Sequence, residues 1–294
     1  MNVEQKSVPF LDSELSVREF SCSMNGKKPV KIDPYVNLYL NITDVCQANC
    51  EFCEFHKSSS RKFSVEKFKI VMKELKERKI PINKINFSGG EPTLELDLIE
   101  EVLSLIEDQV YITINTNGIY LNKISKSKFL EKISCVSLSR HHWKDKQNEE
   151  IFKSHQVAKY KDIKFFSDKS KLHLRCNLIK NYIFDDAMIR KYVEEMSNSG
   201  VYDFGFVSLM KINDYCNENF IDSSRLRFDF RSREISNQKR LGVCSCKNYL
   251  QYSSDGNLVK LYSRINNDVN FDANTLVIDL DTIKQGFNGR KFLC

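Results

Sequence analysis

The sequence has little that would place the protein in a membrane or on nucleic acid. No uninterrupted apolar run approaches the roughly 20 residues that a bilayer span needs, and residues 1–20 lack the apolar centre of a secretory signal. The net charge is only +6 over 294 residues, and the lysines and arginines form no dense patch. We therefore expect neither a membrane nor nucleic acid as a partner, and we expect a cytoplasmic location.

The cysteine content is too low for a disulfide-stabilised scaffold. Ten cysteines in 294 residues fall well short of the roughly 8–10% that marks such proteins. In a reducing compartment, clustered cysteines more often bind metal or do chemistry than form disulfides. Three of the ten lie within residues 46–53, and two more stand at positions 244 and 246. These clusters are the first candidates for function.

The pattern of apolar residues predicts an α/β fold. Six stretches rich in β-branched and aromatic residues are expected to be strands, at residues 37–43, 84–88, 110–116, 135–139, 172–179 and 203–209. Five amphipathic stretches between them are expected to be helices, at residues 64–78, 94–107, 125–132, 144–160 and 185–199. Strands that each lead into a crossover helix give a parallel sheet, here a (βα)6 partial TIM barrel.

The regular alternation ends near residue 210. Residues 213–240 are polar and irregular, residues 249–253 and 258–262 are expected to form a β-hairpin, and a short helix is expected near residues 281–285. We therefore divide the chain into an N-terminal lead-in at residues 1–34, a core at residues 35–210 and a C-terminal extension at residues 211–294.

Cys46, Cys50 and Cys53 directly follow the first expected strand. Three thiolates this close together can hold three corners of a cubane iron–sulfur cluster, whose usual protein ligands are four cysteines. Three protein ligands leave one iron open for another ligand. Two alternatives stay open at this point: a zinc site completed by His56, or thiols that bind nothing.

Three motifs together resemble the radical S-adenosylmethionine (radical SAM) enzymes. Residues 46–53 match the signature CxxxCxΦC, residues 88–92 read SGGEP and resemble the GGEP motif, and residues 115–118 read NTNG and resemble the TNG segment. Each motif follows one of the first three expected strands, which is where ligands gather in such folds. The resemblance covers about residues 35–210. The GxIxGxxE pattern of many members is not evident here.

The resemblance implies a cofactor and a reaction. Cys46, Cys50 and Cys53 would hold a [4Fe–4S] cluster, whose fourth iron is chelated by the amino and carboxylate groups of SAM. One electron from the cluster cleaves SAM to methionine and a 5′-deoxyadenosyl radical, which abstracts a hydrogen atom from the substrate. An electron donor such as flavodoxin or ferredoxin would be a partner.

The GGEP motif has a physical interpretation in that setting. Gly89 and Gly90 lack side chains, so the backbone can approach the methionine part of SAM closely. Glu91 is expected to accept a charge-assisted hydrogen bond from the ammonium group. Pro92 is expected to fix the turn before the helix.

The remaining cofactor-binding candidates lie next to or on the expected strands and are Phe52, Asn115, Asn117, Ser139, Arg140 and Arg175. Phe52 is expected near the adenine and Ser139 near the ribose. Arg140 and Arg175 are candidates for the SAM carboxylate. His141 and His142 are candidate catalytic residues that contact substrate or move a proton; the alternative is that one packs under the loop and the other is solvated.

The C-terminal cysteines suggest a second site. Cys244 and Cys246, followed by the expected hairpin, resemble the start of the twitch or SPASM extensions of this family. The matching cysteine after Gly256 is missing, as is the downstream cysteine run of full SPASM domains. The candidate ligands of an auxiliary [4Fe–4S] cluster are Cys216, Cys244, Cys246 and Cys294. Alternatively, Cys244 or Cys246 returns a hydrogen atom to a substrate radical, or both are structural thiols.

The resemblance therefore predicts an oxygen-sensitive radical SAM enzyme with a (βα)6 core and a small twitch-like hairpin and helix extension. The favoured substrate is a small molecule such as a sugar, a nucleotide or a similar metabolite, which would be epimerised, dehydrogenated or rearranged. The alternative substrate is a ribosomally made peptide. A non-catalytic iron–sulfur or zinc protein with a redox-sensing or binding role is the alternative of another class.

Overall fold

The computed structural model describes residues 2–10, 13–22, 30–32, 36–53, 63–80, 82–106, 110–201, 203–222, 226, 249–254, 257–262, 275–278 and 283–285. Its side chains are described from residue 38 to residue 226 of these ranges, except at residue 83. Among the helices in this part of the chain, none has the length and apolarity needed to cross a membrane.

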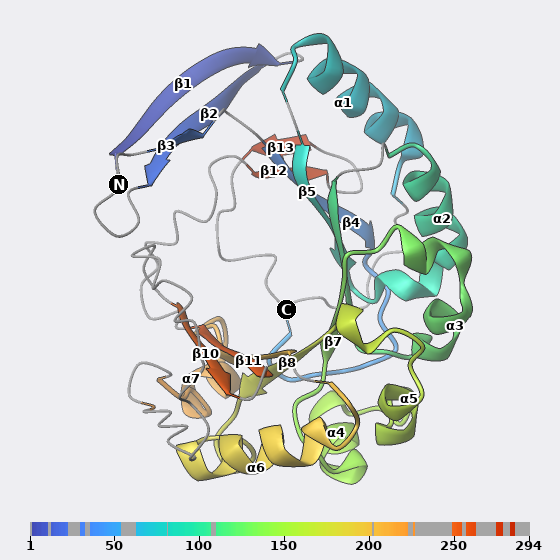
Figure 1. Cartoon of the computed structure of the whole chain (residues 1–294), viewed down its shortest axis with the longest axis vertical. Helices are drawn as coiled ribbons and strands as arrows, with labels where there is room; N and C mark the ends of the chain where they lie inside the picture. The colour runs from blue at the N-terminus through green and yellow to red at the C-terminus, as the bar shows by residue number, and fades with distance from the viewer. Residues whose placement is uncertain are drawn as a thin grey trace.

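Six parallel strands in chain order form a curved sheet (Figure 1). They are β4 (Val36–Thr43), β5 (Ile82–Gly89), β6 (Tyr111–Thr116), β7 (Cys135–Ser139), β8 (Leu172–Leu178) and β9 (Asp203–Ser208). Each strand pairs in parallel with the next one. The six-stranded α/β prediction is confirmed, and the arrangement is that of a partial TIM barrel.

The helices lie on the outer side of the curved sheet (Figure 1). They are α1 (Val65–Glu77), α2 (Leu96–Ser104), α3 (Leu121–Lys126), α4 (Asp145–Phe152), α5 (Tyr160–Lys164) and α6 (Asp186–Ser197). Short 3₁₀ turns η1 (Pro92–Glu95), η2 (Lys128–Glu131) and η3 (Lys169–Lys171) complete the connections. The main apolar core fills the layer between these helices and the sheet.

The two faces of the sheet differ in polarity because side chains alternate along each strand. The outward positions are apolar and buried in the main core, as at Leu40, Phe87, Ile114 and Leu174. The inward positions, placed by the strand register, are Tyr39, Asn41, Asn86, Ser88, Thr113, Asn115, Ser137, Ser139, His173, Arg175 and Asn177. The barrel therefore presents a polar inner face.

The connection after β7 differs from the prediction. The single helix expected at residues 144–160 is two helices, because α4 ends at Phe152 and Lys153 adopts a left-handed conformation with φ of 49°. Residues 153–159 then leave the helix and run to α5. The helix expected at residues 125–132 is likewise split, between α3 and η2.

Both ends of the sheet carry additional strands from the C-terminal region. The predicted hairpin is confirmed as β10 (Tyr249–Ser254) and β11 (Asn257–Tyr262), and β11 pairs in parallel with β9. At the other edge, β12 (Thr275–Ile278) pairs in parallel with β4 and antiparallel with β13 (Ile283–Gln285). The expected helix near residues 281–285 is wrong at β13, which is a strand.

The strand β12 was not predicted, and neither were the N-terminal sheet and the short helix after residue 212. The N-terminal lead-in contains an antiparallel sheet of β1 (Asn2–Phe10), β2 (Ser13–Cys22) and β3 (Val30–Ile32). The segment expected to be irregular after residue 212 begins with the short helix α7 (Asp214–Glu218), whose N-cap is Asn213.

Ser64 starts α1, as its sequence position predicts, because its side chain accepts a hydrogen bond from Lys67 N at 3.2 Å. We expect Ser64→Ala to lower the free energy of unfolding by about 1 kcal/mol, the usual cost of losing an N-cap. Ser64→Asp keeps an acceptor and should retain most of that stability. Urea denaturation of the three proteins provides the measurement, and equal midpoints for wild type and Ser64→Ala would contradict the cap assignment.

Candidate functional site

The loop after β4 carries the three clustered cysteines at the carboxyl ends of the parallel strands. Cys46, Cys50 and Cys53 are all half-buried and free of disulfides. The loop folds back on itself, since Cys53 N donates to Cys50 O at 3.2 Å. Residues 46–53 are called the cysteine loop below.

The GGEP motif holds the first turn of this loop. Gly90 N donates to Thr43 O at 2.7 Å, and Glu91 N donates to Val45 O at 2.8 Å. A Cβ on Gly90 would lie 2.4 Å from Val45 O, and one on Gly89 would lie 2.4 Å from Thr43 O. Gly89 also has φ of 123°, which disfavours any residue with a side chain. Both glycines are therefore needed because the backbone that leads into the cysteine loop passes close to them. The close approach of SAM to the same glycines stays a prediction.

Glu91 is buried and its carboxylate is used within the protein. Oε1 accepts from Thr93 N at 3.1 Å, from Thr93 Oγ1 at 2.6 Å and from Thr116 Oγ1 at 2.7 Å. Oε2 accepts from Asn117 N at 2.7 Å. Burial raises the pKa of Glu91, and these four donors oppose that rise. The carboxylate therefore ties the GGEP turn to the TNG segment, and its bond to the SAM ammonium stays a prediction.

Pro92 takes its predicted place. It occupies the first turn of η1, the 3₁₀ turn that leads into α2, and Glu91 caps that turn through Thr93 N. Proline is well suited to this position because it has no N–H to satisfy there.

Asn117 of the TNG segment connects directly to the cysteine loop. Its Nδ2 donates to Cys46 Sγ at 3.7 Å, while its Oδ1 accepts from Gln47 Nε2 at 2.9 Å. The same Gln47 amide donates to Gln156 O at 2.6 Å. Asn115 lies lower on the inner face, where its Nδ2 donates to Ser88 Oγ at 3.4 Å.

The other side of the cysteine loop is held by segments far along the chain. Asn49 N donates to Phe152 O at 2.8 Å, at the end of α4. Asn213 Nδ2 donates to Glu51 O at 2.9 Å, just before α7. The loop is thus anchored to residues that follow β5, β6, β7 and β9.

These anchoring residues were missed by reasoning from the sequence. The sequence could have indicated Gln47, because it is the polar residue directly after Cys46. Nothing in the sequence indicated Phe152 or Asn213, because only the fold brings them to the loop.

The donor set fits a cubane cluster. Within the described ranges, no three histidine, cysteine or acidic side chains converge on the position of a single metal ion. A cubane does not require such convergence, because each thiolate binds a different iron at a different corner. The amide of Asn117 on Cys46 Sγ is also a hydrogen bond of the kind that tunes cluster sulfurs. His56, the fourth ligand of the zinc alternative, lies outside the described residues.

His141 packs against Phe52 of the cysteine loop. The Phe52 ring lies edge-on to the His141 ring at 5.2 Å, and His141 stacks on Phe152 at 4.8 Å. Phe52 is only 8% exposed and belongs to a small apolar cluster with Ile151 and Cys216. Its predicted contact with adenine is not supported by this buried position.

His141 and His142 are both held in the neutral form. His141 Nδ1 accepts from Asn177 N at 3.0 Å, and His142 Nδ1 accepts from Lys144 N at 3.0 Å. Burial, with further contributions from nearby arginines, lowers the pKa of His141 to about 3. Burial, with smaller contributions from Arg140 and Lys144, lowers the pKa of His142 to about 4. The predicted proton transfer by these rings stays a prediction, and a pKa close to the working pH is best for it.

Arg140 is fully buried, and its guanidinium binds groups within the protein. Its guanidinium donates to Ala158 O at 2.9 Å, to Trp143 O at 2.8 Å and to Asp145 Oδ1 at 2.7 Å. Asp145 Oδ1 also accepts from Tyr160 N at 2.9 Å. This network holds the guanidinium among the connections after β7, and the contact of Arg140 with the SAM carboxylate stays a prediction.

Ser139 and Arg175 keep the position that their predicted roles require. The register pairs them across β7 and β8, and both are partly exposed. Leu174 and Cys176, on either side of Arg175, point into the main core. Arg175 therefore faces inward and stays a candidate for an anionic group.

The predicted C-terminal ligand set is not brought together in the described part of the chain. Cys216 is fully buried on α7 and its Sγ donates to Phe52 O at 3.8 Å. Cys216 belongs to an apolar cluster with Phe52, and Cys50 and Cys53 pack against that cluster, so Cys216 lies beside the cysteine loop. Cys244, Cys246 and Cys294 lie outside the described residues.

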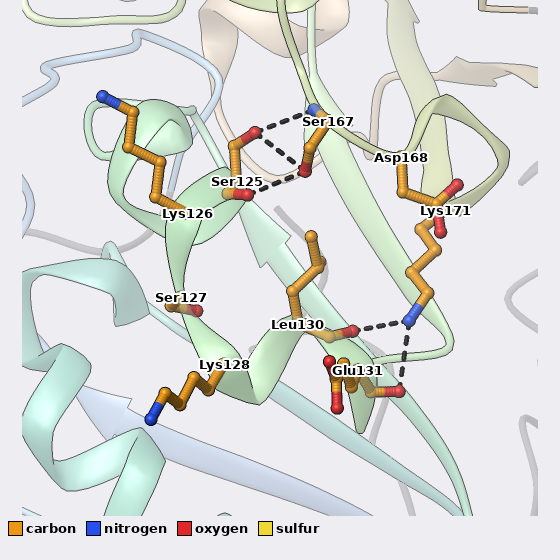
Figure 2. A pocket seen from close by; sticks show the side chains of 9 residues that line it. All are labelled: Ser125, Lys126, Ser127, Lys128, Leu130, Glu131, Ser167, Asp168 and Lys171. Carbon is orange, nitrogen blue, oxygen red and sulfur yellow. Dashed lines mark hydrogen bonds between the residues drawn. The ribbon is translucent and has the colours of Figure 1, made fainter.

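A pocket at the opposite ends of the strands is distinct from this site (Figure 2). Lys171 Nζ donates to Leu130 O at 2.6 Å and to Glu131 O at 3.1 Å across it. Ser125 and Ser167 bond to each other at 3.0 Å. These polar groups bind one another and connect η2 to the segment before β8. Their role is therefore to stabilise the packing of these two segments.

The buried neutral histidines should make the apoprotein sensitive to acid. Between about pH 6.5 and pH 4 the unfolded chain binds protons on these histidines that the folded chain does not, so stability falls as the pH falls. A single histidine with the pKa of His141 gives a loss of about 2 kcal/mol between pH 7 and pH 5. Urea denaturation at both pH values is the measurement. His141→Asn should lose stability less steeply, and the same slope in both proteins would contradict the assignment.

Comparison with known proteins agrees with this geometry. Residues 40–164 match the model of the Radical SAM superfamily. A "probable GTP 3′,8-cyclase" of Saccharolobus solfataricus is 30% identical over 112 residues, which are 37% of this chain and 35% of that protein. The 7,8-dihydro-6-hydroxymethylpterin dimethyltransferase of Methanocaldococcus jannaschii is 33% identical over 105 residues, 34% of this chain and 20% of that enzyme. The chain thus covers about a third or less of the length of these relatives.

The fold is also found among solved structures. Streptococcus suis SuiB bound to its precursor peptide SuiA superposes with a TM-score of 0.50 at 19% identity, over 62% of this chain and 41% of that one. SuiB bound to S-adenosylmethionine gives the same TM-score, over 66% of this chain and 44% of that one. The superfamily implies a [4Fe–4S] cluster and SAM, and its enzymes need a reductant and a substrate. The sequence match assigns residues 40–164 of this chain to the radical SAM superfamily, and the likeness to SuiB concerns the fold.

Proposed function

We propose that the protein cleaves SAM reductively at a [4Fe–4S] cluster held by Cys46, Cys50 and Cys53, and that it uses the resulting radical on a small polar substrate. The observation that carries the proposal is the cysteine loop itself. It lies at the carboxyl ends of the parallel strands, next to a polar inner face, and is anchored by the residues after four of those strands. Bound there, the cluster and SAM supply one-electron chemistry.

The chain's own residues give this site order and shielding. Glu91 and Asn117 connect the GGEP and TNG turns to each other and to Cys46, which fixes one wall. Phe52 and Cys216 close the floor of the loop with apolar contacts. Arg175 and Ser139 face inward from neighbouring strands and are the candidate contacts for the carboxylate and ribose of SAM.

The polar inner face favours a hydrogen-bonding small molecule as substrate. Amide and hydroxyl side chains predominate there, and His173 Nδ1 lies 3.0 Å from Asp203 Oδ1 on adjacent strands. Such a surface suits a sugar, a nucleotide or a similar metabolite, because polar side chains in a binding site orient a ligand through its hydrogen-bonding groups. The two curated relatives carry names with a nucleotide and a pterin, which are polar small molecules. Epimerisation, dehydrogenation and rearrangement stay equally open.

A ribosomally made peptide is the second candidate substrate. Its support is the likeness to SuiB, which was solved with a precursor peptide, and that likeness concerns the fold. The two candidates differ in one measurable way. A substrate should raise the rate of SAM cleavage, so nucleotides and sugars on one side and peptides on the other can be compared in that assay.

The remaining expectations belong to the same proposal. Flavodoxin or ferredoxin would deliver the electron in the cytoplasm, where such donors and reduced thiols occur. The twitch-like extension would begin after residue 210, and the candidate ligands of an auxiliary [4Fe–4S] cluster there are Cys216, Cys244, Cys246 and Cys294. A purely redox-sensing protein would use the same cysteines without cleaving SAM.

Cys50→Ala tests the proposal directly. After anaerobic reconstitution with iron and sulfide, the wild type should convert SAM to 5′-deoxyadenosine when dithionite is added. Cys50→Ala should lose this activity and most of the cluster absorbance, because a cubane with two protein ligands is weakly held. Cys22→Ala, in the N-terminal sheet, is the matched control and should behave as wild type. Undiminished cleavage by Cys50→Ala would refute the ligand assignment, and no cleavage by the wild type would favour the sensor.

Gly90→Ala tests the role of the GGEP turn. The added Cβ would lie 2.4 Å from Val45 O, so the backbone entering the cysteine loop must move. We expect the iron retained per chain after reconstitution and desalting to fall by more than half, while the far-UV circular dichroism stays unchanged. Gly200→Ala is the control for the strain of a glycine-to-alanine change alone, because Gly200 has a positive φ of 87° and lies after α6, away from the cysteine loop. Equal iron in both variants would show that this close approach does not matter to the site.

A further inference from the structure

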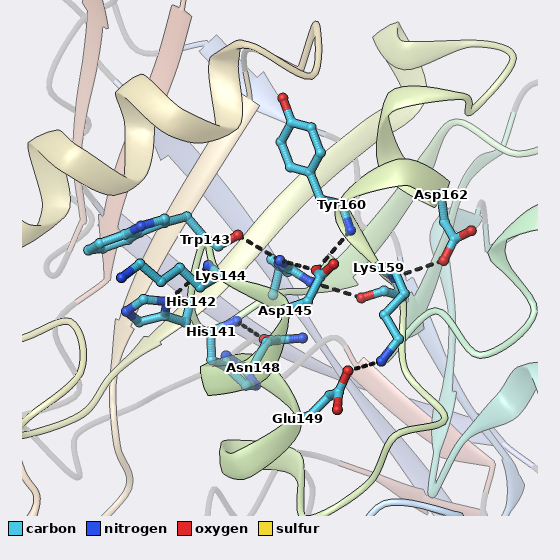
Figure 3. A network of polar contacts seen from close by, with 12 residues as sticks. His141, His142, Trp143, Lys144, Asp145, Asn148, Glu149, Lys159, Tyr160 and Asp162 are labelled. Carbon is cyan, nitrogen blue, oxygen red and sulfur yellow. Dashed lines mark hydrogen bonds and ion pairs between the residues drawn. The ribbon is translucent and has the colours of Figure 1, made fainter.

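His141 is surrounded by contacts that fix its backbone and its ring. Its backbone N donates to Asn148 Oδ1 at 2.8 Å, and its backbone O accepts from Cys176 Sγ at 3.5 Å. Its ring accepts from Asn177 N at 3.0 Å through Nδ1. Asn148 lies on α4 and is fully buried (Figure 3). The residue is therefore immobilised from β8 and from α4 at once.

The ring of His141 faces the cysteine loop through two aromatic contacts. Phe52, the residue before Cys53, lies edge-on to it at 5.2 Å and 90°. Phe152 stacks on it at 4.8 Å, and the carbonyl of Phe152 accepts the hydrogen bond from Asn49 N, next to Cys50. The ring thus contacts Phe52, which precedes Cys53, and Phe152, whose carbonyl binds the residue that precedes Cys50.

Histidine is the one residue type that meets both requirements of this position. A phenylalanine ring could stack in the same way but would leave the N–H of Asn177 without an acceptor. An asparagine could accept that N–H but would remove the aromatic surface. A buried donor without an acceptor and a lost ring contact are both costly, so the two functions can be separated by mutation.

We propose that His141 is a positioning residue for the cysteine loop: its neutral ring, fixed by Asn177, holds Phe52 and Phe152 and thereby sets the placement of Cys50 and Cys53. This inference rests on the proposed function for its importance in catalysis. It does not depend on that function for its test, because the packing exists in the chain without cofactor. His141 then acts through the loop and not on the substrate.

The experiment uses His141→Asn and His141→Phe in the full chain. Hydrogen–deuterium exchange of the apoprotein reports on the backbone of residues 46–53, which includes the protected N–H groups of Asn49 and Cys53. His141→Asn should raise exchange in this segment about tenfold, because both ring contacts to the loop are lost. His141→Phe should keep the segment within about twofold of wild type while lowering the melting temperature, since the N–H of Asn177 loses its acceptor.

Two further proteins make the result decisive. His155→Asn is the matched control, because the His155 side chain is 92% exposed and pairs with Glu149 at the surface. It should leave exchange at residues 46–53 unchanged. Phe52→Leu removes the edge-on contact from the loop side and should raise exchange there as His141→Asn does, which keeps the test valid if a His141 variant does not fold.

Cluster spectroscopy then separates this inference from the proposed function. In reconstituted protein, electron paramagnetic resonance of the reduced cluster should show a broadened signal for His141→Asn and a wild-type signal for His141→Phe. Unchanged exchange in both His141→Asn and Phe52→Leu would overturn the positioning role, whether or not the protein cleaves SAM. Raised exchange in these variants with no SAM cleavage by wild type would support the positioning role and refute the proposed function.

Discussion

The buried carboxylate of Glu91 is the interaction on which the site depends. It accepts four hydrogen bonds from Thr93, Thr116 and Asn117, while its own backbone N–H donates to Val45. A buried carboxylate is costly unless donors replace its water. Here those donors come from the turns after two adjacent strands, so satisfying the charge also fixes the turns. The cysteine loop begins where this arrangement holds the backbone.

The rest of the loop is held by contacts of a different kind. On the Cys46 side, polar groups bond to the sulfur and to Gln47. On the Cys53 side, aromatic and apolar groups pack against Phe52. One side therefore offers hydrogen bonds and the other excludes water. Hydrogen bonds to the sulfurs and exposure to solvent both affect the reduction potential of an iron–sulfur cluster. The polar inner face begins on the first of these two sides.

Several residues that looked available for a ligand serve the fold. Arg140, Glu91 and His141 carry charge or a titratable ring, and all three are almost completely buried with partners inside the protein. From the sequence these three residues were candidates for binding a ligand or for catalysis. Residue type alone does not say whether a side chain points toward a ligand or into the protein. The inward direction of Arg175 could be predicted from the sequence. Its neighbours on the strand, Leu174 and Cys176, are core residues, and side chains alternate between the two faces of a sheet.

The sequence by itself determined the parallel strand order, the three motifs and their places after the strands, because apolar periodicity and short-range spacing are local properties. It also determined the hairpin near the C-terminus and the start of α1 at Ser64. Only the tertiary structure decided what braces the cysteine loop. Phe152, Asn213 and Cys216 stand about 100 to 170 positions away from it in the chain, and α4 ends early so that Phe152 O can reach Asn49 N. Contacts of that kind depend on how the ends of separate strands meet, which no local pattern encodes.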